Sequence, residues 1–406
     1  MSQYQVTLDH DLLQRLFAND GLKPLLEQIV NQVLQAQVSE HLQAEPHERT
    51  DERQGYRNGT RERSLTTRIG TLNLQVPRLR QGRFTTDLFD RYQRSEQALL
   101  LCMVEMVIQG VSTRKVSAVV EELCGEEVSK SQVSLLCQRL DPQVLAWRER
   151  DLSQSLYPFV LVDALVIRVR KDGRVRQQSL LLATGINREG YRAGTLWVLG
   201  LFLGDSESET SWGTFFSALK LRGLSGVDLV VSDNHKGLVK ALHQQFQEAS
   251  WQHCQTHLTR NVLSGCPQNE QASLHKQLRR LFEADTPEAA RGLLGEIVAC
   301  YGKSAPKAVD CLEAAFDDAT AVLCLPERYR KRLRTTNSQE RLNEEIRRRE
   351  RVIRIFPNAA SAERLLGALL IEFDEGFATG HRYFDMTDYW SWKQQQQIQP
   401  AQQRAA

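Results

Sequence analysis

The spacing of apolar residues changes several times along the 406-residue chain and predicts blocks of different secondary structure. Over residues 8–43, leucine, isoleucine and valine recur every three or four positions, which predicts helix with a break at Asp20-Gly21. Alternation over 64–69 and 71–76, joined at Gly70, then favours two short strands or a hairpin. The chain therefore begins with helix followed by a small β element.

Residues 96–140 return to helical spacing. Ser112 is placed to cap a helix that runs to Cys124, Gly125 offers a stop, and Ser129 is placed to cap a second helix. Two short helices joined by a tight turn are the outline of a helix-turn-helix. DNA recognition and simple packing in a helical domain both agree with this outline.

Between 158 and about 255 the pattern is α/β. Three apolar runs, then a helix, a strand, a helix and a last strand are predicted at 159–169, 177–186, 195–203, 210–221, 227–232, 237–246 and up to about 253. A meander followed by helix, strand and helix is the order of an RNase H-like core with a mixed five-stranded sheet. Other α/β folds also begin with meanders.

The rest of the chain is predicted to be helical. Residues 255–330 interrupt the α/β pattern before a last helical section at 337–376, and the Gln- and Ala-rich tail after 390 is expected to be disordered. The predicted fold is thus an α/β RNase H-like core with an α-helical insertion, preceded by a mainly helical N-terminal DNA-binding region. The predicted divisions are 1–92 (helical and basic), 93–150 (helix-turn-helix-like), 155–258 (first part of the core), 259–330 (insertion), 331–390 (last part of the core) and 391–406 (tail).

Composition adds little about function. Apolar residues make up 41% and charged residues 25% of the chain, as in ordinary globular proteins. None of the eight cysteines has CxxC spacing, which favours reduced thiols rather than disulfides. No signal peptide is evident, and the apolar runs are far shorter than the roughly 20 residues that span a bilayer. We expect a cytoplasmic protein with no membrane partner.

The distribution of charge is more informative than the net charge of +2. Nine arginines face three acids between 49 and 83, and eleven basic residues face four acids between 328 and 354. Helical i,i+4 pairs explain Glu344–Arg348 and Glu345–Arg349 but not the whole second cluster, so we expect salt-dependent binding to DNA phosphates. The candidate DNA-binding residues are Arg57, Arg61, Arg63, Arg78, Arg80, Arg114, Lys115, Arg341, Arg347, Arg348, Arg349 and Arg351.

Two aspartates stand out in the α/β part. Asp163 lies inside a strongly apolar strand, where a carboxylate is costly unless it is paired or bound to metal. Asp233 ends a strand, where active groups of α/β sheets gather, although it could simply cap the next helix. Converging carboxylates are the ligands with which two divalent cations promote phosphodiester cleavage.

A third carboxylate is harder to choose. In Thr335-Thr-Asn-Ser-Gln-Glu, Asn337 followed three residues later by Glu340 has the spacing of a capping box, which would account for Glu340 fully. Glu344 would share its helical face. The residues themselves leave Glu340, Glu344 and Glu345 as candidates.

Cys254 and His257 form a further motif at the end of the fifth predicted strand. Their i,i+3 spacing could contribute to a zinc site, but two more ligands are not evident nearby. A nucleophilic Cys–His pair is conceivable, yet nothing else points to acyl or thiol chemistry. Packing or hydrogen bonding is the preferred interpretation.

Several segments together resemble the Mutator-like family of bacterial insertion-sequence transposases. The matching segments are Gly55-Tyr-Arg-Asn-Gly, Arg91-Tyr-Gln-Arg-Ser-Glu, Gly110-Val-Ser-Thr-Arg-Lys-Val, Val162-Asp-Ala, Gly204-Asp-Ser-Glu-Ser-Glu, Ser232-Asp-Asn-His-Lys-Gly-Leu, Cys254-Gln-Thr-His, Thr335-Thr-Asn-Ser-Gln-Glu-Arg-Leu-Asn and Phe356-Pro-Asn. The resemblance runs nearly end to end, from Asp20 to Phe384. It departs from the family pattern at Leu165, Glu350 and Arg354, none of which removes a predicted ligand.

The resemblance implies a DDE active site on an RNase H-like fold, formed by Asp163, Asp233 and Glu340 around two Mg²⁺ ions, for which Mn²⁺ can substitute. It also implies cleavage at transposon 3′ ends, strand transfer, binding of terminal inverted repeats and target DNA, assembly into a dimer or larger complex, and a location at the bacterial nucleoid. Cys254 and His257 correspond to a family signature with a role in local architecture or DNA-end binding. The alternatives are another RNase H-like nuclease and an inactive relative that only binds repeat DNA.

Overall fold

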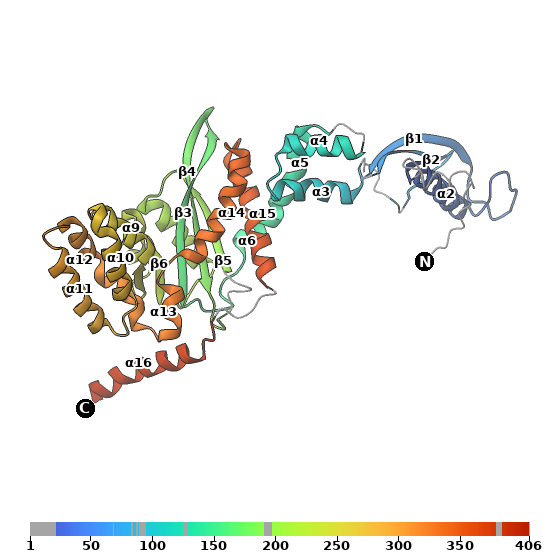
Figure 1. Cartoon of the computed structure of the whole chain (residues 1–406). Coiled ribbons are helices and arrows are strands. Elements are labelled where there is room, and N and C mark those ends of the chain that lie inside the picture. The colour runs from blue at the N-terminus through green and yellow to red at the C-terminus, as the bar shows by residue number, and fades with distance from the viewer. Residues whose placement is uncertain are drawn as a thin grey trace. The chain divides into compact units, whose positions relative to one another are not determined.

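The computed structural model describes residues 22–67, 69–82, 84–86, 88, 95–124, 128–190, 197–378 and 384–405. The chain divides into two compact units, Met1–Arg139 and Leu140–Ala406, which are described separately (Figure 1). The part of the first predicted helix before residue 22 lies outside the described residues.

The first unit begins with a helix packed on a β-hairpin. Helix α2 (Leu22–Leu42) covers strands β1 (Arg57–Thr67) and β2 (Gly70–Leu79), and Leu34 meets Leu72 and Leu74 in their shared core. The predicted hairpin is therefore confirmed and is longer than the alternation suggested, because the outer half of β1 is polar and exposed. Helix and strand each account for 21 residues here, so a mainly helical region before residue 92 is not confirmed.

Three short helices complete the first unit: α3 (Gln97–Ile108), α4 (Thr113–Cys124) and α5 (Lys130–Cys137). The hydroxyl of Ser129 accepts a hydrogen bond from the Gln132 amide, and the Gln132 side chain caps the Ser129 amide in return. The Ser112 hydroxyl accepts a 3.4 Å bond from the Lys115 amide. Both predicted helix starts are confirmed, whereas Gly125 lies outside the described residues.

The second unit is built on a mixed five-stranded sheet, as predicted. Its strands are β3 (Phe159–Lys171), β4 (Arg174–Ile186), β5 (Trp197–Gly204), β6 (Leu229–Ser232) and β7 (Ser250–His253). The order across the sheet is β5-β4-β3-β6-β7, in which β3, β6 and β7 are parallel and β4 is antiparallel to β3 and β5. Strand β3 is therefore central.

Helices cover both faces of this sheet, which is why β3 is apolar on both sides. Val160 and Val162 face a core shared with helices α7 (Glu209–Leu221) and α8 (Lys236–Gln245). Phe159 and Leu161 point the other way, into a core with helix α13 (Glu327–Leu333) and the C-terminal helix α16 (Thr387–Ala405). Asp163 lies two residues beyond Leu161 on the same strand, so it is on the same face of the sheet as Phe159 and Leu161.

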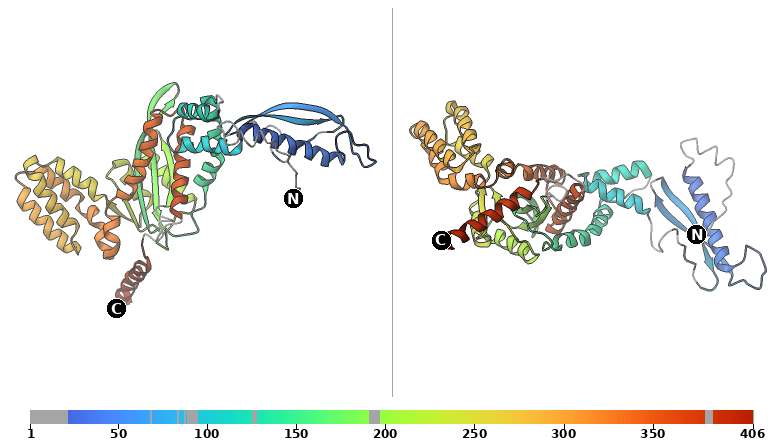
Figure 2. Two further views of the ribbon diagram at one scale, coloured as in Figure 1. Left: turned by 45° about the vertical axis from the view of Figure 1, so that its right-hand side comes forward. Right: turned by 90° about the horizontal axis from the view of Figure 1, so that it is seen from below.

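Of the remaining helices, α6 precedes the sheet in the chain and α9 to α16 follow it. Their bounds are α6 (Asp141–Glu149), α9 (Gln255–Ser264), α10 (Gln268–Phe282), α11 (Pro287–Tyr301), α12 (Pro306–Thr320), α13 (Glu327–Leu333), α14 (Asn337–Ile353), α15 (Ala359–Ala378) and α16 (Thr387–Ala405). Helices α9 to α12 share a core of their own and form a separate block in both views of Figure 2. This block is the predicted helical interruption.

The expected disorder of the tail is wrong for its described part, because residues 391–405 continue helix α16. Alanine and glutamine are good helix formers, so the composition that suggested disorder also permits a helix. The helix is anchored at its start, where the Tyr389 hydroxyl and Lys393 both bind the Asp228 carboxylate, the latter at 2.7 Å. Among the described residues, no helix has the length and apolarity needed to cross a membrane.

Two leucines of α7 allow a matched test of the core. Leu219 is 1% exposed and Leu221 is 89% exposed. We expect Leu219→Ala to lower the free energy of unfolding by about 2–5 kcal/mol, because it leaves a cavity, and Leu221→Ala to change it by less than about 0.5 kcal/mol. Urea unfolding followed by tryptophan fluorescence measures both; equal shifts would contradict the packing described.

Candidate active site

Asp163 of β3 lies near Asp233, the residue directly after the neighbouring parallel strand β6, as the effect of the Asp233 charge on Asp163 shows. The register pairs Phe159 with Leu229 and Leu161 with Val231, and the same offset continued by two residues would set Asp163 level with Asp233. Adjacent strands are about 4.8 Å apart. Asp233 follows β6 directly and precedes α8, at the carboxyl end of the strand where the sequence predicted it.

Asp163 is held by two hydrogen bonds in a largely apolar setting. The Ala164 amide donates to its Oδ1 at 2.8 Å, and the Asn343 side-chain amide donates to its Oδ2 at 2.6 Å. Burial raises the pKa of Asp163 from its ordinary 3.8 to about 6, and the negative charge of Asp233 acts in the same direction. The pair is therefore unfavourable without a compensating positive charge.

His257 supplies part of that compensation. Its hydrogen bond with Cys254 raises the pKa of the imidazole despite burial, and Asp233 and Asp163 add to this rise. The imidazole and the two carboxylates therefore favour each other's charged forms. The motif that the sequence singled out thus lies at the acidic pair.

Cys254 connects this region to the helix that carries Glu340. Its thiol accepts hydrogen bonds of 3.4 Å from both the amide and the hydroxyl of Thr336, the residue before α14. Burial acts to raise the pKa of the Cys254 thiol. The hydrogen bonds with His257 and Thr336 outweigh this effect, so the pKa of the thiol is lowered overall. This arrangement favours the interpretation of Cys254 and His257 as local architecture.

Glu207 is a further acidic residue at the site, and residue spacing did not single it out. It follows β5, and its Oε1 lies 3.4 Å from Nδ1 of His235. Burial raises the pKa of the Glu207 carboxyl. The charge of His235 acts to lower this pKa, whereas the negative charges of Asp233 and Asp163 raise it further. The only signal in the sequence was its place within Gly204-Asp-Ser-Glu-Ser-Glu.

Gly237 explains how the segment with Glu207 comes so close to Asp233. A Cβ on Gly237 would lie 2.8 Å from the Glu209 nitrogen and 2.9 Å from the Ser208 carbonyl carbon. Only glycine lets the first turns of α7 and α8 approach in this way. The positive ends of two helix dipoles therefore meet near the acidic residues.

Helix α14 brings Glu340 to the same face of the sheet. The helix begins after Thr336, which has no side-chain cap, and Asn337 is its first residue. The predicted Asn337–Glu340 capping box is therefore wrong: Asn337 is already helical, and its side chain accepts a 3.3 Å bond from Thr256. The local explanation that competed with a catalytic role for Glu340 is removed.

Asn343, which binds Asp163, is a reference point for the three glutamates on α14. At 3.6 residues per turn, Glu340 projects about 60° from Asn343 around the helix, Glu344 about 100° and Glu345 about 160°. Glu344 is exposed, and Glu345 binds Arg348 at 3.0 Å and also Arg349. The geometry thus favours Glu340.

Across the described residues, no three His, Cys, Asp or Glu side chains converge closely enough to hold an ion. The structure brings Asp163 and Asp233 together and puts Glu340 one helical turn from the residue that binds Asp163.

The basic residues of α14 are not equally available. Arg349 is only 4% exposed and bound to Glu345, so its placement contradicts the predicted contact with DNA. Arg347 donates to the Val166 carbonyl at 2.7 Å and pairs with Glu350, which ties α14 to β3. Arg341, Arg348 and Arg351 are exposed.

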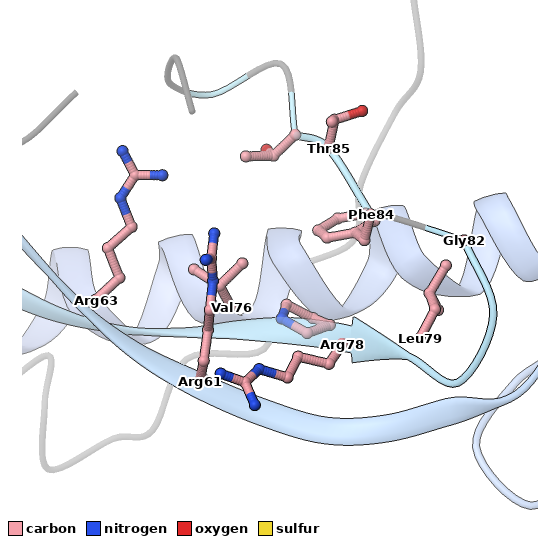
Figure 3. Close-up of a pocket in the computed structure, with 10 residues that line it drawn as sticks. Arg61, Arg63, Val76, Arg78, Leu79, Gly82, Phe84 and Thr85 are labelled. Atoms are coloured by element: carbon pink, nitrogen blue, oxygen red, sulfur yellow. The ribbon is translucent and has the colours of Figure 1, made fainter. Parts of the chain in front are cut away.

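The N-terminal arginines gather at a pocket of about 270 Å³ on the hairpin. Figure 3 shows its lining, which includes Arg61, Arg63, Arg78, Val76, Leu79 and Phe84. Arg57 instead binds the Ser39 hydroxyl at 2.7 Å and the Ala44 carbonyl, so it joins β1 to the end of α2. Arg80, Arg114 and Lys115 are exposed.

These features fit an enzyme of DNA rearrangement, and comparison with known sequences identifies the class. The chain belongs to the Mutator family of transposases, whose family profile matches residues 2–380.

Named relatives cover nearly the whole chain. It is 42% identical to the transposase for insertion sequence element IS256 in transposon Tn4001 of Staphylococcus aureus, over 95% of this chain and 99% of the relative. It is 41% identical to the transposase for ISRM5 of Rhizobium meliloti (91% and 92%) and 37% identical to that for IS1081 of Mycobacterium tuberculosis (90% and 88%).

The raised pKa of Asp163 predicts a pH dependence of stability. The folded carboxyl keeps a proton that the unfolded chain releases, so its contribution to the free energy of unfolding falls as the pH rises from 3.8 to about 6. We expect Asp163→Asn to abolish this pH dependence, which amounts to up to about 3 kcal/mol between pH 4 and pH 7. Denaturation at several pH values in EDTA measures this, with exposed Asp310→Asn as the control; equal behaviour of both variants would refute the burial effect.

Proposed function

We propose that this transposase cleaves and rejoins DNA at an RNase H-like DDE site formed by Asp163, Asp233 and Glu340. The observation that carries the proposal is the nearness of two carboxylates, Asp163 on β3 and Asp233 directly after the adjacent parallel strand β6. Glu340 would join them from α14, whose Asn343 binds Asp163. The strand order agrees with an RNase H-like core, and the helical block α9 to α12 accounts for the long separation between Asp233 and Glu340.

The donor set fits divalent magnesium. Hard cations prefer carboxylate oxygens, and two partly buried carboxylates in repulsive contact would be stabilised by such ions. Asp163, Asp233 and Glu340 would hold two Mg²⁺ ions, with Mn²⁺ as a substitute. When bound, the ions supply activation of the attacking oxygen and neutralisation of charge on the leaving oxygen.

The chain's own residues would orient the reaction. The amide of Asn343 fixes the rotamer of Asp163, and the contact of Cys254 with Thr336 fixes where α14 begins. Water attacks the phosphodiester at the element's end, which leaves a 3′-hydroxyl and a 5′-phosphate. That 3′-hydroxyl then attacks a phosphodiester of another strand, and the strand it cuts leaves with its own 3′-hydroxyl.

DNA would be bound by both units. The hairpin pocket presents three arginines over an apolar floor, and α14 presents Arg341, Arg348 and Arg351. The relatives' names refer to insertion sequence elements, so we propose that the substrates here are terminal inverted repeats and target DNA. Bringing two ends together calls for a dimer or larger assembly on DNA, at the bacterial nucleoid.

The cleavage test uses end-bearing DNA and Mg²⁺. We expect strand-specific nicking and joining by the unaltered chain. The nicking rate should fall at least about a hundredfold in Asp163→Asn, Asp233→Asn and Glu340→Gln, because each change removes a carboxylate that would hold the ions that stabilise the transition state. Glu344→Gln and Glu345→Gln are the matched controls on the same helix. Product gels with end-labelled strands measure the rates.

The outcomes separate the alternatives. Binding without nicking at any metal or salt concentration would show an inactive repeat-binding relative. Cleavage of branched DNA without a preference for the element's end would show another nuclease. If Glu344→Gln abolishes nicking and Glu340→Gln does not, the third ligand is misassigned.

A second prediction concerns the hairpin pocket. Neutralising Arg61, Arg63 and Arg78 to Gln should weaken DNA binding and make its salt dependence shallower by about 0.9 for each lost phosphate contact. Arg57→Gln should instead lower thermal stability with little change in the salt slope, because Arg57 binds within the protein. Fluorescence anisotropy across a salt series measures both; a steep loss of binding in Arg57→Gln alone would reverse the assignment.

A further inference from the structure

Strands β3 and β4 continue beyond the rest of the sheet as a two-stranded ribbon. The neighbours stop early: β6 pairs with β3 only as far as Leu161, and β5 pairs with β4 only from Ser179 onward. The β3–β4 pairing continues to Lys171 and Arg174, and Figure 1 shows the two strands reaching past their neighbours. No prediction from residue spacing assigned a role to this ribbon.

The ribbon is strongly basic. Arg168, Arg170, Lys171, Arg174 and Arg176 are exposed on it, against one acid, Asp172, at the turn. Lys171 is paired with Asp205 at 2.8 Å. The four arginines make no ion pair with any described residue, although the charge of Arg176 helps to lower the pKa of Asp205. By the register of the ribbon, Arg168 and Arg170 lie on one of its faces, and Arg174 and Arg176 lie on the other.

The ribbon is fixed firmly to the active-site helix. Its base pairs with the segment after α14: the Phe356 amide donates to the Arg168 carbonyl and the Arg170 amide donates to the Phe356 carbonyl, both at 2.9 Å. Arg347 of α14 binds the Val166 carbonyl. A rigid mount of this kind suits a positioning surface better than a mobile loop.

We infer that this ribbon binds the phosphate backbone of the duplex whose cleavage is proposed above, on one side of the cut. At about 3.3 Å per residue, and with Arg174 paired to Lys171 and Arg176 to Val169, the four arginines lie roughly 17–26 Å from Asp163 along the ribbon. This distance equals about five to eight base pairs of duplex. The inference rests on the proposed function and adds a location for the bound DNA.

The test measures DNA binding without cleavage, in full-length chain carrying Asp163→Asn. Arg168, Arg170, Arg174 and Arg176 are changed together to Gln and, in a second variant, to Lys. The control removes equal charge from the exposed residues Lys276, Arg280, Lys303 and Lys307 of the helical block. The probes are a labelled duplex with the element's end and flanking DNA, and an unrelated duplex of equal length.

We expect the Gln variant to bind at least about tenfold more weakly, with a salt slope shallower by roughly 2–4, and the Lys variant to restore both. Loss on the end-bearing probe alone would place the transposon end on the ribbon, and loss on both probes would place target DNA there too. Methylphosphonates about five to eight base pairs from the cut should weaken binding of the parent chain but not of the Gln variant.

Two failures are distinguishable. If the parent chain binds neither probe, the proposed function fails. If it binds but the Gln variant matches the helical-block control in affinity, salt slope and methylphosphonate response, the ribbon has no role in binding and only this inference is overturned.

Discussion

The structure depends on one electrostatic constraint: two carboxylates, one of them largely buried, lie near each other, Asp163 on β3 and Asp233 directly after the adjacent parallel strand β6. Such a pair is costly in an apolar sheet, and its neighbours are arranged to reduce that cost. Asn343 donates to Asp163, His257 tends toward its charged form, and the helix ends at Gly237 bring partial positive charge. These compensations are incomplete, and an incompletely neutralised carboxylate pair is ready to bind cations.

Charge is divided within the second unit. Acidic groups occupy the middle of the sheet, and basic groups occupy the outer face of α14 and the β3–β4 ribbon. The first unit has basic residues of its own at the hairpin pocket. For a transposase this division matters, because DNA is negatively charged and would approach an acidic site. Arginines that bind phosphates away from that site would offset the repulsion between the scissile phosphate and the carboxylates.

Most of the fold could be predicted from the sequence because its helices and strands have a clear periodic pattern of apolar residues. The three-strand meander, α7 and the two serine-capped helix starts were all found from local patterns. Asp163 and Asp233 could be chosen from strand context alone. The tail was misjudged because glutamine and alanine suit both helix and disorder, and the contacts of Tyr389 with Asp228 join residues 161 positions apart. Glu207 and the actual start of α14 depend on similar long-range contacts, which periodicity does not encode.

The contact between Cys254 and Thr336 has a consequence for evolution and engineering. The helical block leaves the sheet at Cys254 and returns at Thr336, and the Gln255 amide bonds to the Arg334 carbonyl at 3.0 Å beside the thiol contact. The segments that lead into and out of the helical block are therefore hydrogen-bonded to each other at one point. A segment whose ends already touch can be lengthened, shortened or exchanged with little effect on its host. The number of residues between Asp233 and Glu340 can then change without moving the start of α14, because the contacts of Cys254 and Gln255 hold that start in place.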